Sequence, residues 1–336
     1  MFFINNLYYY GILIYGDSMK DKQFKNLDEQ VEIFRHKGLT ITDEEYTKDV
    51  LLRENYFFIS GYRHLFMQKD NNKTYIEGAT FEELYSLFLF DRQFRNIIFK
   101  NLLIVENNAK SIFSYQLSKK YGYKENDYLK PANFDTSPEK SRQVNDLIRK
   151  MKRQVRVNGS QHTATMHYIS NYGYIPLWVL VKVLSFGIIS EFYSILKPED
   201  KLAIAKIYNI DVNNLSNYLS ILANYRNVCA HEDILYENKT QKSINDTVYH
   251  ILLGIDKENG EFTKGKNDLF ALIIILRQVL SNADVKNLIC ELERLVDNLS
   301  MNLHSISINK VLDRMGFPLN WKEIANIEKR PYNSEE

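Results

Sequence analysis

Residues 224–235, NYRNVCAHEDIL, place an arginine, an asparagine and a histidine within six positions of a predicted helix. Arginine stays charged and presents a planar fork that matches phosphate oxygens, whereas histidine exchanges protons near neutral pH. Phosphodiester cleavage without a metal needs both a cation that holds the phosphate and a group that moves protons. Arg226 and His231 are therefore candidate catalytic residues. Asn227, four residues before His231, can fix the tautomer of the imidazole by a hydrogen bond.

On a helix of about 100° per residue, Arg226 continues the apolar line of Leu215, Leu219 and Leu222. A desolvated guanidinium needs an anion, which is either a protein carboxylate or a substrate phosphate. In the purely structural alternative, Arg226 binds a carboxylate and His231 is a solvated helix residue. His231 lies about 140° round the helix from Arg226, so one helix makes a poor site. Two such helices across a two-fold axis would bring both pairs together, which suggests a homodimer with a composite site.

Helical periodicity dominates the remaining chain. In residues 81–119, apolar positions recur at steps of three and four, which predicts one long buried stripe. Residues 175–196 are nearly all apolar but contain charged residues and a glycine, which favours a buried helix or a bent helix pair over a membrane span. Residues 55–66 fit a short strand or the start of a helix, and residues 256–268 read as a polar loop. The predicted fold class is all-α.

Composition excludes several classes of protein. The 336 residues carry a formal net charge of +1, so any nucleic-acid surface must be a local patch. The two cysteines, Cys229 and Cys290, lie far apart without a CxxC motif, which excludes a disulfide framework and fits a reducing cytoplasm. No cluster of metal-ligand residues stands out, so we expect neither a metal nor a cofactor.

The first residues are apolar but lack a basic segment and a cleavage site, which argues against a signal peptide. Their uncharged run of about 16 residues is shorter than the ~20 that a membrane span needs. Sequence typical of a soluble protein follows Met19. We expect residues 1–18 either to precede the true start at Met19 or to form an N-terminal extension.

The densest basic run lies on the predicted helix at 141–156 and consists of Arg149, Lys150, Lys152, Arg153 and Arg156. It is either a solvated helix face or a track for RNA phosphates, since RNA affinity is largely electrostatic. The chain also holds 23 tyrosines and 19 phenylalanines, which either fill the core or stack on unpaired bases. Cys229 fits a small packing residue better than a nucleophile.

RNVCAH resembles the R-(polar)-x3-H motif of HEPN-type ribonucleases. Longer stretches, spanning residues of about 27 to 237 in the family's order, look like the Abi (abortive infection) family of the AbiD/AbiF type, which are bacterial phage-resistance proteins. These stretches are LDEQVEIFRHKGLTITD, ENYFFISGYRHLF, FDRQFRNIIFKNLLIVENNAKSIFSYQLSKKYG, YIPLWVLVKVLSFGIISEFYSIL and YRNVCAHEDILY.

The resemblance implies a helical HEPN-like bundle core with helical additions at both ends. We expect an N-terminal helical module at 19–80, the HEPN-like core at 81–240, a C-terminal helical region at 241–328 and a tail at 329–336. It also implies a cytoplasmic, homodimeric, metal-independent endoribonuclease that acts in phage defence or as a toxin. Such enzymes use the RNA 2′-OH as nucleophile and leave 2′,3′-cyclic phosphate ends. Arg226 and His231 match the motif pair, and Asn227 matches its polar companion.

Two positions depart from the family pattern. Where relatives often carry arginine, this chain has Lys110, which keeps the charge and is counted among the expected RNA contacts but loses the fork. Where relatives often carry glutamate, it has Lys182, which reverses the charge. These departures keep a second interpretation open, a catalytically inactive RNA- or protein-binding module. The expected partners are the RNA substrate, a second copy of the chain and a small RNA or protein antitoxin, with no membrane.

Overall fold

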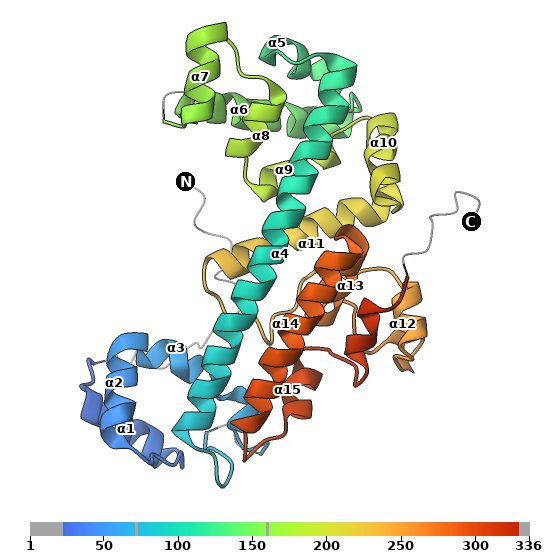
Figure 1. The fold of residues 1–336 in the computed structure, drawn as a ribbon. Helices are drawn as coiled ribbons and strands as arrows, with labels where there is room; N and C mark the ends of the chain where they lie inside the picture. The colour runs from blue at the N-terminus through green and yellow to red at the C-terminus, as the bar shows by residue number, and fades with distance from the viewer. Residues whose placement is uncertain (1–22, 71–72, 159–160, 329–336) are drawn as a thin grey trace.

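The computed structural model describes residues 23–70, 73–158 and 161–328 of the chain (Figure 1). Within these residues, fifteen α-helices make up nearly all of the regular structure, and the strands form one two-stranded sheet. The predicted all-α fold is therefore confirmed. The expectations for residues 1–18 and 329–336 lie outside the described residues.

The longest element is α4 (Phe81–Tyr121), whose 41 residues correspond to a length of about 60 Å. Thr80 and Glu83 form a capping box at its start, and Gly122, with a φ of 89°, follows its end. The predicted stripe is confirmed, because Phe94, Ile98, Leu102, Val105 and Ala109 are buried and its last member, Ile112, is partly buried against the core. The helices packed against α4 include α8 (Leu177–Val183), α10 (Pro198–Tyr208), α11 (Val212–Ala230) and α14 (Asn282–Met301).

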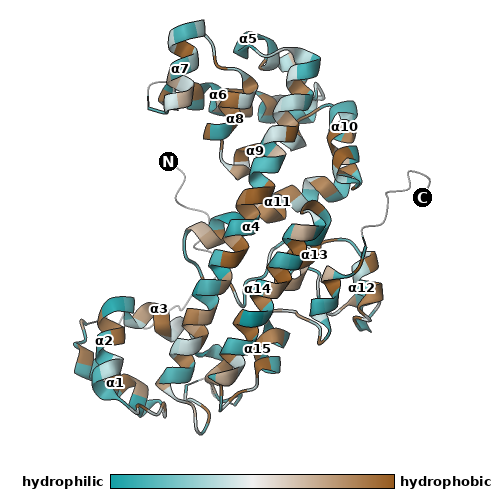
Figure 2. Cartoon of the chain, viewed as in Figure 1, coloured by the Kyte–Doolittle hydropathy of each residue, from teal (hydrophilic) through white to brown (hydrophobic). Residues whose placement is uncertain are grey.

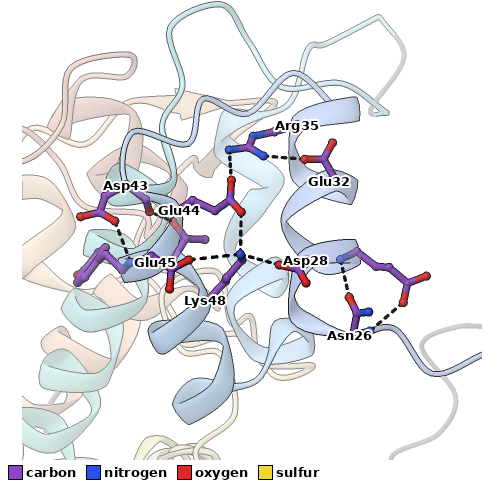
Figure 3. A network of polar contacts seen from close by, with 11 residues as sticks. Asn26, Asp28, Glu32, Arg35, Asp43, Glu44, Glu45 and Lys48 are labelled. Carbon is purple, nitrogen blue, oxygen red and sulfur yellow. Dashed lines mark hydrogen bonds and ion pairs between the residues drawn. The ribbon is translucent and has the colours of Figure 1, made fainter.

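The segment before α4 forms four short helices, α1 (Leu27–His36), α2 (Glu44–Glu54), α3 (Tyr56–Ser60) and the 3-10 helix η1 (Gly61–Phe66). The run that fitted either a strand or a helix is therefore helical. Figure 3 shows the ion pairs between α1 and α2, in which Lys48 Nζ of α2 lies 2.5 Å from Asp28 of α1. Within α2, Lys48 Nζ also lies 2.7 Å from Glu44. Hydrogen bonds to these carboxylates raise the pKa of Lys48. Glu44 also pairs with Arg35 of α1, so it orients the two helices.

A lobe lies beyond the C-terminal half of α4 and contains, besides α8, the elements α5 (Glu125–Tyr128), η2 (Pro131–Asn133), α6 (Pro138–Asn158), α7 (Thr163–Tyr172) and α9 (Phe186–Ser194) (Figure 1). The apolar run at 175–196 forms α8 and α9, with Ser185 as the N-cap of the second helix, so the bent-pair interpretation holds. Among the described residues, none of the helices combines the length and apolar character that a membrane span requires.

The C-terminal part contains α12 (Val248–Leu252), β1 (Lys257–Glu258), β2 (Glu261–Phe262), α13 (Leu269–Val279), α15 (Ile308–Arg314) and η3 (Trp321–Ala325). The small β1–β2 hairpin lies in the run that read as a loop. Every residue of α13 except Gln278 is buried, and Figure 2 shows how apolar residues concentrate on this helix. Glu83 of α4 accepts hydrogen bonds of 2.6 Å from the backbone N–H groups of His304 and Ser305, which joins this part to the start of α4.

A buried carboxylate on α4, Asp91, joins three segments that are far apart in the sequence. It accepts hydrogen bonds from Tyr62 Oη at 2.7 Å and from the backbone N–H groups of Leu235 at 3.0 Å and Tyr236 at 2.7 Å. Arg95, one turn further along α4, forms an ion pair with the same carboxylate. Asp91 has no exposed surface, so these donors and the guanidinium offset the cost of removing its charge from water.

We predict that Asp91→Asn lowers the free energy of unfolding by about 3–5 kcal/mol, because it leaves the buried Arg95 without its counter-ion. Urea unfolding followed by circular dichroism measures this loss. The matched control is Asp49→Asn, which removes an exposed partner of Arg53 on α2 and should cost roughly 0.5 kcal/mol or less. Equal losses in the two variants would contradict the structural role of Asp91.

Candidate active site

Arg226 lies one turn before the end of α11, with its guanidinium turned toward Glu106 of α4. Arg226 Nε donates to Oε2 of Glu106 at 3.3 Å, and the guanidinium carbon lies 5.8 Å from the centroid of the Phe99 ring. The side chain is 28% exposed, at the end of the buried line formed by Leu215, Leu219 and Leu222. The sequence left open whether Arg226 binds a protein carboxylate or a substrate phosphate, and in the structure it binds the carboxylate of Glu106. Within the described part of the chain, the two terminal guanidinium nitrogens form no hydrogen bond.

Glu106 is the residue that sequence reasoning missed. Its side chain is only 5% exposed, and it binds two cations, because Oε1 lies 2.7 Å from Nζ of Lys110. One carboxylate between two cations leaves a net positive charge at the surface between α4 and α11. The sequence feature that could have indicated Glu106 is its position four residues before Lys110, because this spacing allows an ion pair on a helix. Lys110, predicted to contact RNA, has its Nζ directed to Glu106 in the free chain.

His231 follows the last residue of α11 and forms its C-terminal cap. Its backbone N–H donates to the carbonyl oxygen of Asn227 at 2.9 Å, and Glu232 then takes a left-handed conformation with a φ of 58°. The helix therefore ends before His231 and does not continue to residue 235 as the sequence suggested. The side chains of Asn227 and His231 are exposed, and neither forms a hydrogen bond within the described residues. The proposed bond from Asn227 to the imidazole is thus absent, and both side chains are free to meet a ligand.

We call residues 226–236 the motif segment. Glu106 holds its first residue and Asp91 holds its last two, and both carboxylates come from α4. The two acids are 15 residues apart, which corresponds to about 22 Å along the helix. His231 lies in the middle of the motif segment, which is fixed at both ends while its central side chain stays in solvent.

A pocket of about 250 Å³ opens between α4 and the end of α11. Its lining is Arg92, Arg95, Asn96, Phe99, Cys229, Ala230 and Glu232. Phe99 is shared with the Arg226 contact, so the pocket adjoins the Arg226–Glu106 pair. Arg92 pairs with Glu54, Arg95 pairs with Asp91, and Glu232 adds a carboxylate to the lining. The pocket therefore offers polar groups and the flat face of Phe99 to a ligand. The pocket thus extends the candidate site along α4 toward Asp91.

The thiol of Cys229 is buried next to the motif residues, and burial raises its pKa to about 12. It therefore stays protonated at neutral pH, and a protonated thiol is a poor nucleophile. The interpretation of Cys229 as a packing residue agrees with this environment.

The predicted basic run lies on α6, in the lobe beyond the C-terminal half of α4 (Figure 1). Lys152, Arg153 and Arg156 are exposed, and within the described residues they take part in no ion pair. Arg149 pairs with Asp146 of the same helix, and Lys150 pairs with Glu191 of α9 at 2.7 Å. The structure therefore places the basic run outside the pocket. No group of three or more potential metal ligands is found in the described ranges.

A family model of Abi-like proteins matches residues 49–237, more than half of the chain. The chain belongs to the Abi-like protein family. Neither the curated proteins nor the solved structures include a significant match to it. The family match covers the motif segment and both carboxylates that hold it, and it suggests a role in abortive infection.

We predict that Glu106 and Arg226 of this Abi-like chain stabilise each other by about 1–3 kcal/mol, because the carboxylate is buried and the bond is charge-assisted. A double-mutant cycle of Glu106→Gln and Arg226→Gln, measured by urea unfolding, gives this coupling energy. The control cycle is Lys100→Gln with Glu291→Gln, an ion pair at 2.6 Å that joins α4 to α14 at the surface. Its coupling should be roughly 0–1 kcal/mol. A Glu106–Arg226 coupling no larger than the control would count against the pair as an anchor.

Proposed function

We propose that this Abi-like protein is a metal-independent endoribonuclease of the HEPN type that acts in abortive infection. The observation that carries the proposal is the motif segment, in which a partly engaged guanidinium and an exposed imidazole sit five residues apart beside a pocket. The runner-up is a catalytically inactive RNA- or protein-binding module on the same fold. In either case, the family resemblance leads us to expect a small RNA or protein antitoxin as a further partner.

Arg226 is suited to hold the scissile phosphate. Glu106 engages only its Nε, so the two terminal nitrogens can bind two phosphate oxygens in the bidentate geometry that a guanidinium favours. Glu106 also fixes the direction of the guanidinium before substrate arrives, which reduces the entropy lost on binding. The ion pair with Lys110 keeps the local charge positive while the carboxylate is satisfied.

His231 is suited to move protons. In the proposed reaction its imidazole removes the proton of the RNA 2′-OH, and the 2′-oxygen attacks the adjacent phosphorus. The bond from phosphorus to the 5′-oxygen breaks, and this oxygen takes up a proton to leave as a 5′-OH. The other product is a 2′,3′-cyclic phosphate. No water or metal ion enters this step, so atoms and charge balance between the RNA and the protein groups.

A second copy of the chain completes the site in this proposal. Arg226 is directed to Glu106 of α4, whereas the side chain of His231 is exposed and forms no hydrogen bond within the described residues, so no contact within one protomer joins the two groups. Asn224 and Asn227 are exposed on the same end of α11, and Leu103 is 37% exposed on α4 between Phe99 and Glu106. A two-fold axis through this surface would bring two motif segments together, with one His231 as base and the other as acid.

The environments of Lys110 and Lys182, the two departures from the family pattern, favour the active enzyme over the inactive module. Lys110 forms an ion pair with Glu106 at 2.7 Å, so the carboxylate that orients Arg226 keeps a second cation. Lys182 is exposed on α8 and lies outside the contacts described for the motif segment. Neither substitution removes a group that the proposed reaction uses.

We predict that His231→Ala lowers the single-turnover rate of RNA cleavage by roughly 10²–10⁴-fold with little change in RNA affinity, because the imidazole acts on protons. Arg226→Lys should keep part of the binding but lose most of the rate, since it loses the fork. The parent should cleave in EDTA and leave 2′,3′-cyclic phosphate ends. A 5′-phosphate product, or a requirement for Mg²⁺, would refute the mechanism. Full activity of His231→Ala would refute the assigned role.

We further predict that the protein sediments as a dimer at micromolar concentration, and that Leu103→Arg and Asn227→Arg shift it toward the monomer with a parallel loss of cleavage. Both positions are exposed, so the arginine side chains can be accommodated in the monomer. Leu319→Arg is the matched control, because Leu319 is 85% exposed and follows α15, outside the proposed interface. A monomer that cleaves RNA at the full rate would exclude the composite site.

A growth assay separates the enzyme from the inactive module. Induced expression of the parent should arrest growth of the host, and His231→Ala at equal protein level should not. An arrest that persists in His231→Ala would favour the binding module, since binding does not depend on proton transfer.

A further inference from the structure

The lobe beyond α4 exposes a row of aromatic side chains that the proposed reaction does not use. Trp178, Tyr123 and Tyr172 are 46%, 44% and 57% exposed, and Tyr168 and Tyr174 are partly exposed. They come from four places in the sequence, namely the turn after α4, helix α7, the turn between α7 and α8, and the start of α8. We call these five residues the aromatic row.

The rings of the aromatic row touch in sequence along the surface. The centroid separations are 6.1 Å for Trp178–Tyr123, 5.6 Å for Tyr123–Tyr174, 6.3 Å for Tyr174–Tyr172 and 5.4 Å for Tyr172–Tyr168. All four pairs are tilted, at angles between 36° and 54°, so no ring covers a neighbour as in a parallel stack. The row therefore combines mutual support with ring surface that stays in solvent.

The backbone under the aromatic row is held in place. Tyr128 Oη donates to the carbonyl oxygen of Ile175 at 2.8 Å, and the N–H of Ile175 donates to the Glu125 carboxylate. Tyr128 and Ile175 are buried, as is Leu177 at the start of α8. Tyr168 also packs against the core, whereas Tyr123, Tyr172 and Trp178 are exposed and are not part of it.

Positive charge accompanies the aromatic row. Lys124 Nζ lies 5.3 Å from the centroid of Tyr174 and 6.0 Å from that of Tyr123. Helix α6 packs against α7 and α8, the helices that carry most of the row. Its exposed basic side chains recur at steps of seven, four and three residues, which places them along one side of the helix: Arg142, Arg149, Arg153 and Arg156.

We propose that the aromatic row and the basic side of α6 form a binding surface for single-stranded RNA, in which unpaired bases stack on the rings and phosphates lie along the arginines. Exposed rings with a lysine against them, on a lobe that also carries a basic helix side, are the combination that non-specific single-strand binders use. Tyrosine, tryptophan and arginine are also enriched at protein interfaces, so a protein partner is the alternative that a failure to bind RNA would favour. This inference rests on the proposed function and names its substrate as RNA with an unpaired segment.

The test uses the full chain with His231→Ala, so that bound RNA is not cleaved, and a labelled RNA oligonucleotide of about 12 nucleotides, within the range of known single-strand sites. Tyr123→Ala with Trp178→Ala should weaken binding by roughly 5- to 150-fold, the contribution of stacking a single base. Tyr123→Phe with Trp178→Phe keeps both rings and should bind within about twofold of the parent. Tyr46→Ala, which removes a tyrosine of similar exposure on α2, is the matched control and should bind as the parent does.

Tryptophan fluorescence reports the contact directly. The chain has two tryptophans, and Trp321 is 1% exposed, so quenching on addition of RNA should arise at Trp178 and vanish in Trp178→Phe. A duplex of the same sequence should compete poorly, since its bases are already stacked. Unchanged affinity in the double alanine variant, absent quenching, or equal affinity for the duplex would each overturn the inference. The inference would also be overturned if the double phenylalanine variant lost as much RNA affinity as the double alanine variant.

The outcomes also separate this inference from the proposed function. RNA that binds with quenching of Trp178 but is not cleaved by the parent would refute the ribonuclease and leave the binding surface in place. RNA that the parent cleaves, with binding unaffected by loss of the two rings, would refute the binding surface and leave the ribonuclease in place.

Discussion

The arrangement of the molecule depends on two buried carboxylates of α4, Asp91 and Glu106. Each is removed from water, which is costly for a charged group, and each recovers that cost only if its donors and cations stay in place. Some of those partners lie at the two ends of the motif segment, namely Arg226 for Glu106 and the N–H groups of Leu235 and Tyr236 for Asp91. The electrostatic requirement of α4 is therefore met only when the end of α11 and the turn after it lie across this helix.

This constraint separates what is rigid in the candidate site from what is open. The backbone of residues 226–236 is fixed at both ends, and Arg226 is oriented through a single nitrogen. His231 carries no side-chain partner within the described residues, and the adjoining pocket is lined by two more arginines. A site of this kind has its geometry set before a ligand binds, while the groups proposed to act on the ligand remain unoccupied.

Local patterns were enough to predict the elements. The stripe of α4, the basic helix α6 and the break between α8 and α9 all follow from spacing within one segment, because the interactions that create them are local. The apolar line of Leu215, Leu219 and Leu222 was also predicted from spacing. Because Arg226 continues this line, the sequence correctly predicted that its guanidinium has an anionic partner.

The sequence pattern did not predict which anion pairs with Arg226. Glu106 is 120 residues away in the sequence, and only the packing of α4 on α11 brings it near. The hydrogen bonds of Asp91 were not predicted for the same reason, since their donors are 29, 144 and 145 residues away from Asp91 in the sequence. The end of α11 before His231 was missed because it depends on the left-handed conformation of Glu232, which glutamate seldom adopts. A one-sequence pattern cannot reveal contacts whose energy comes from tertiary structure.

The two proposed RNA contacts are connected by one element. Glu106 orients Arg226 near the middle of α4, and Tyr123 follows the end of the same helix. From Glu106 to Tyr121 the helix rises by about 22 Å, since it spans 15 residues at ~1.5 Å each. A continuous helix with a buried stripe resists bending, so the separation between a stacked base and the cleaved bond would be constant. In that arrangement α4 acts as a ruler, and the cleavage position is set by distance from the unpaired segment as well as by the base at the cut.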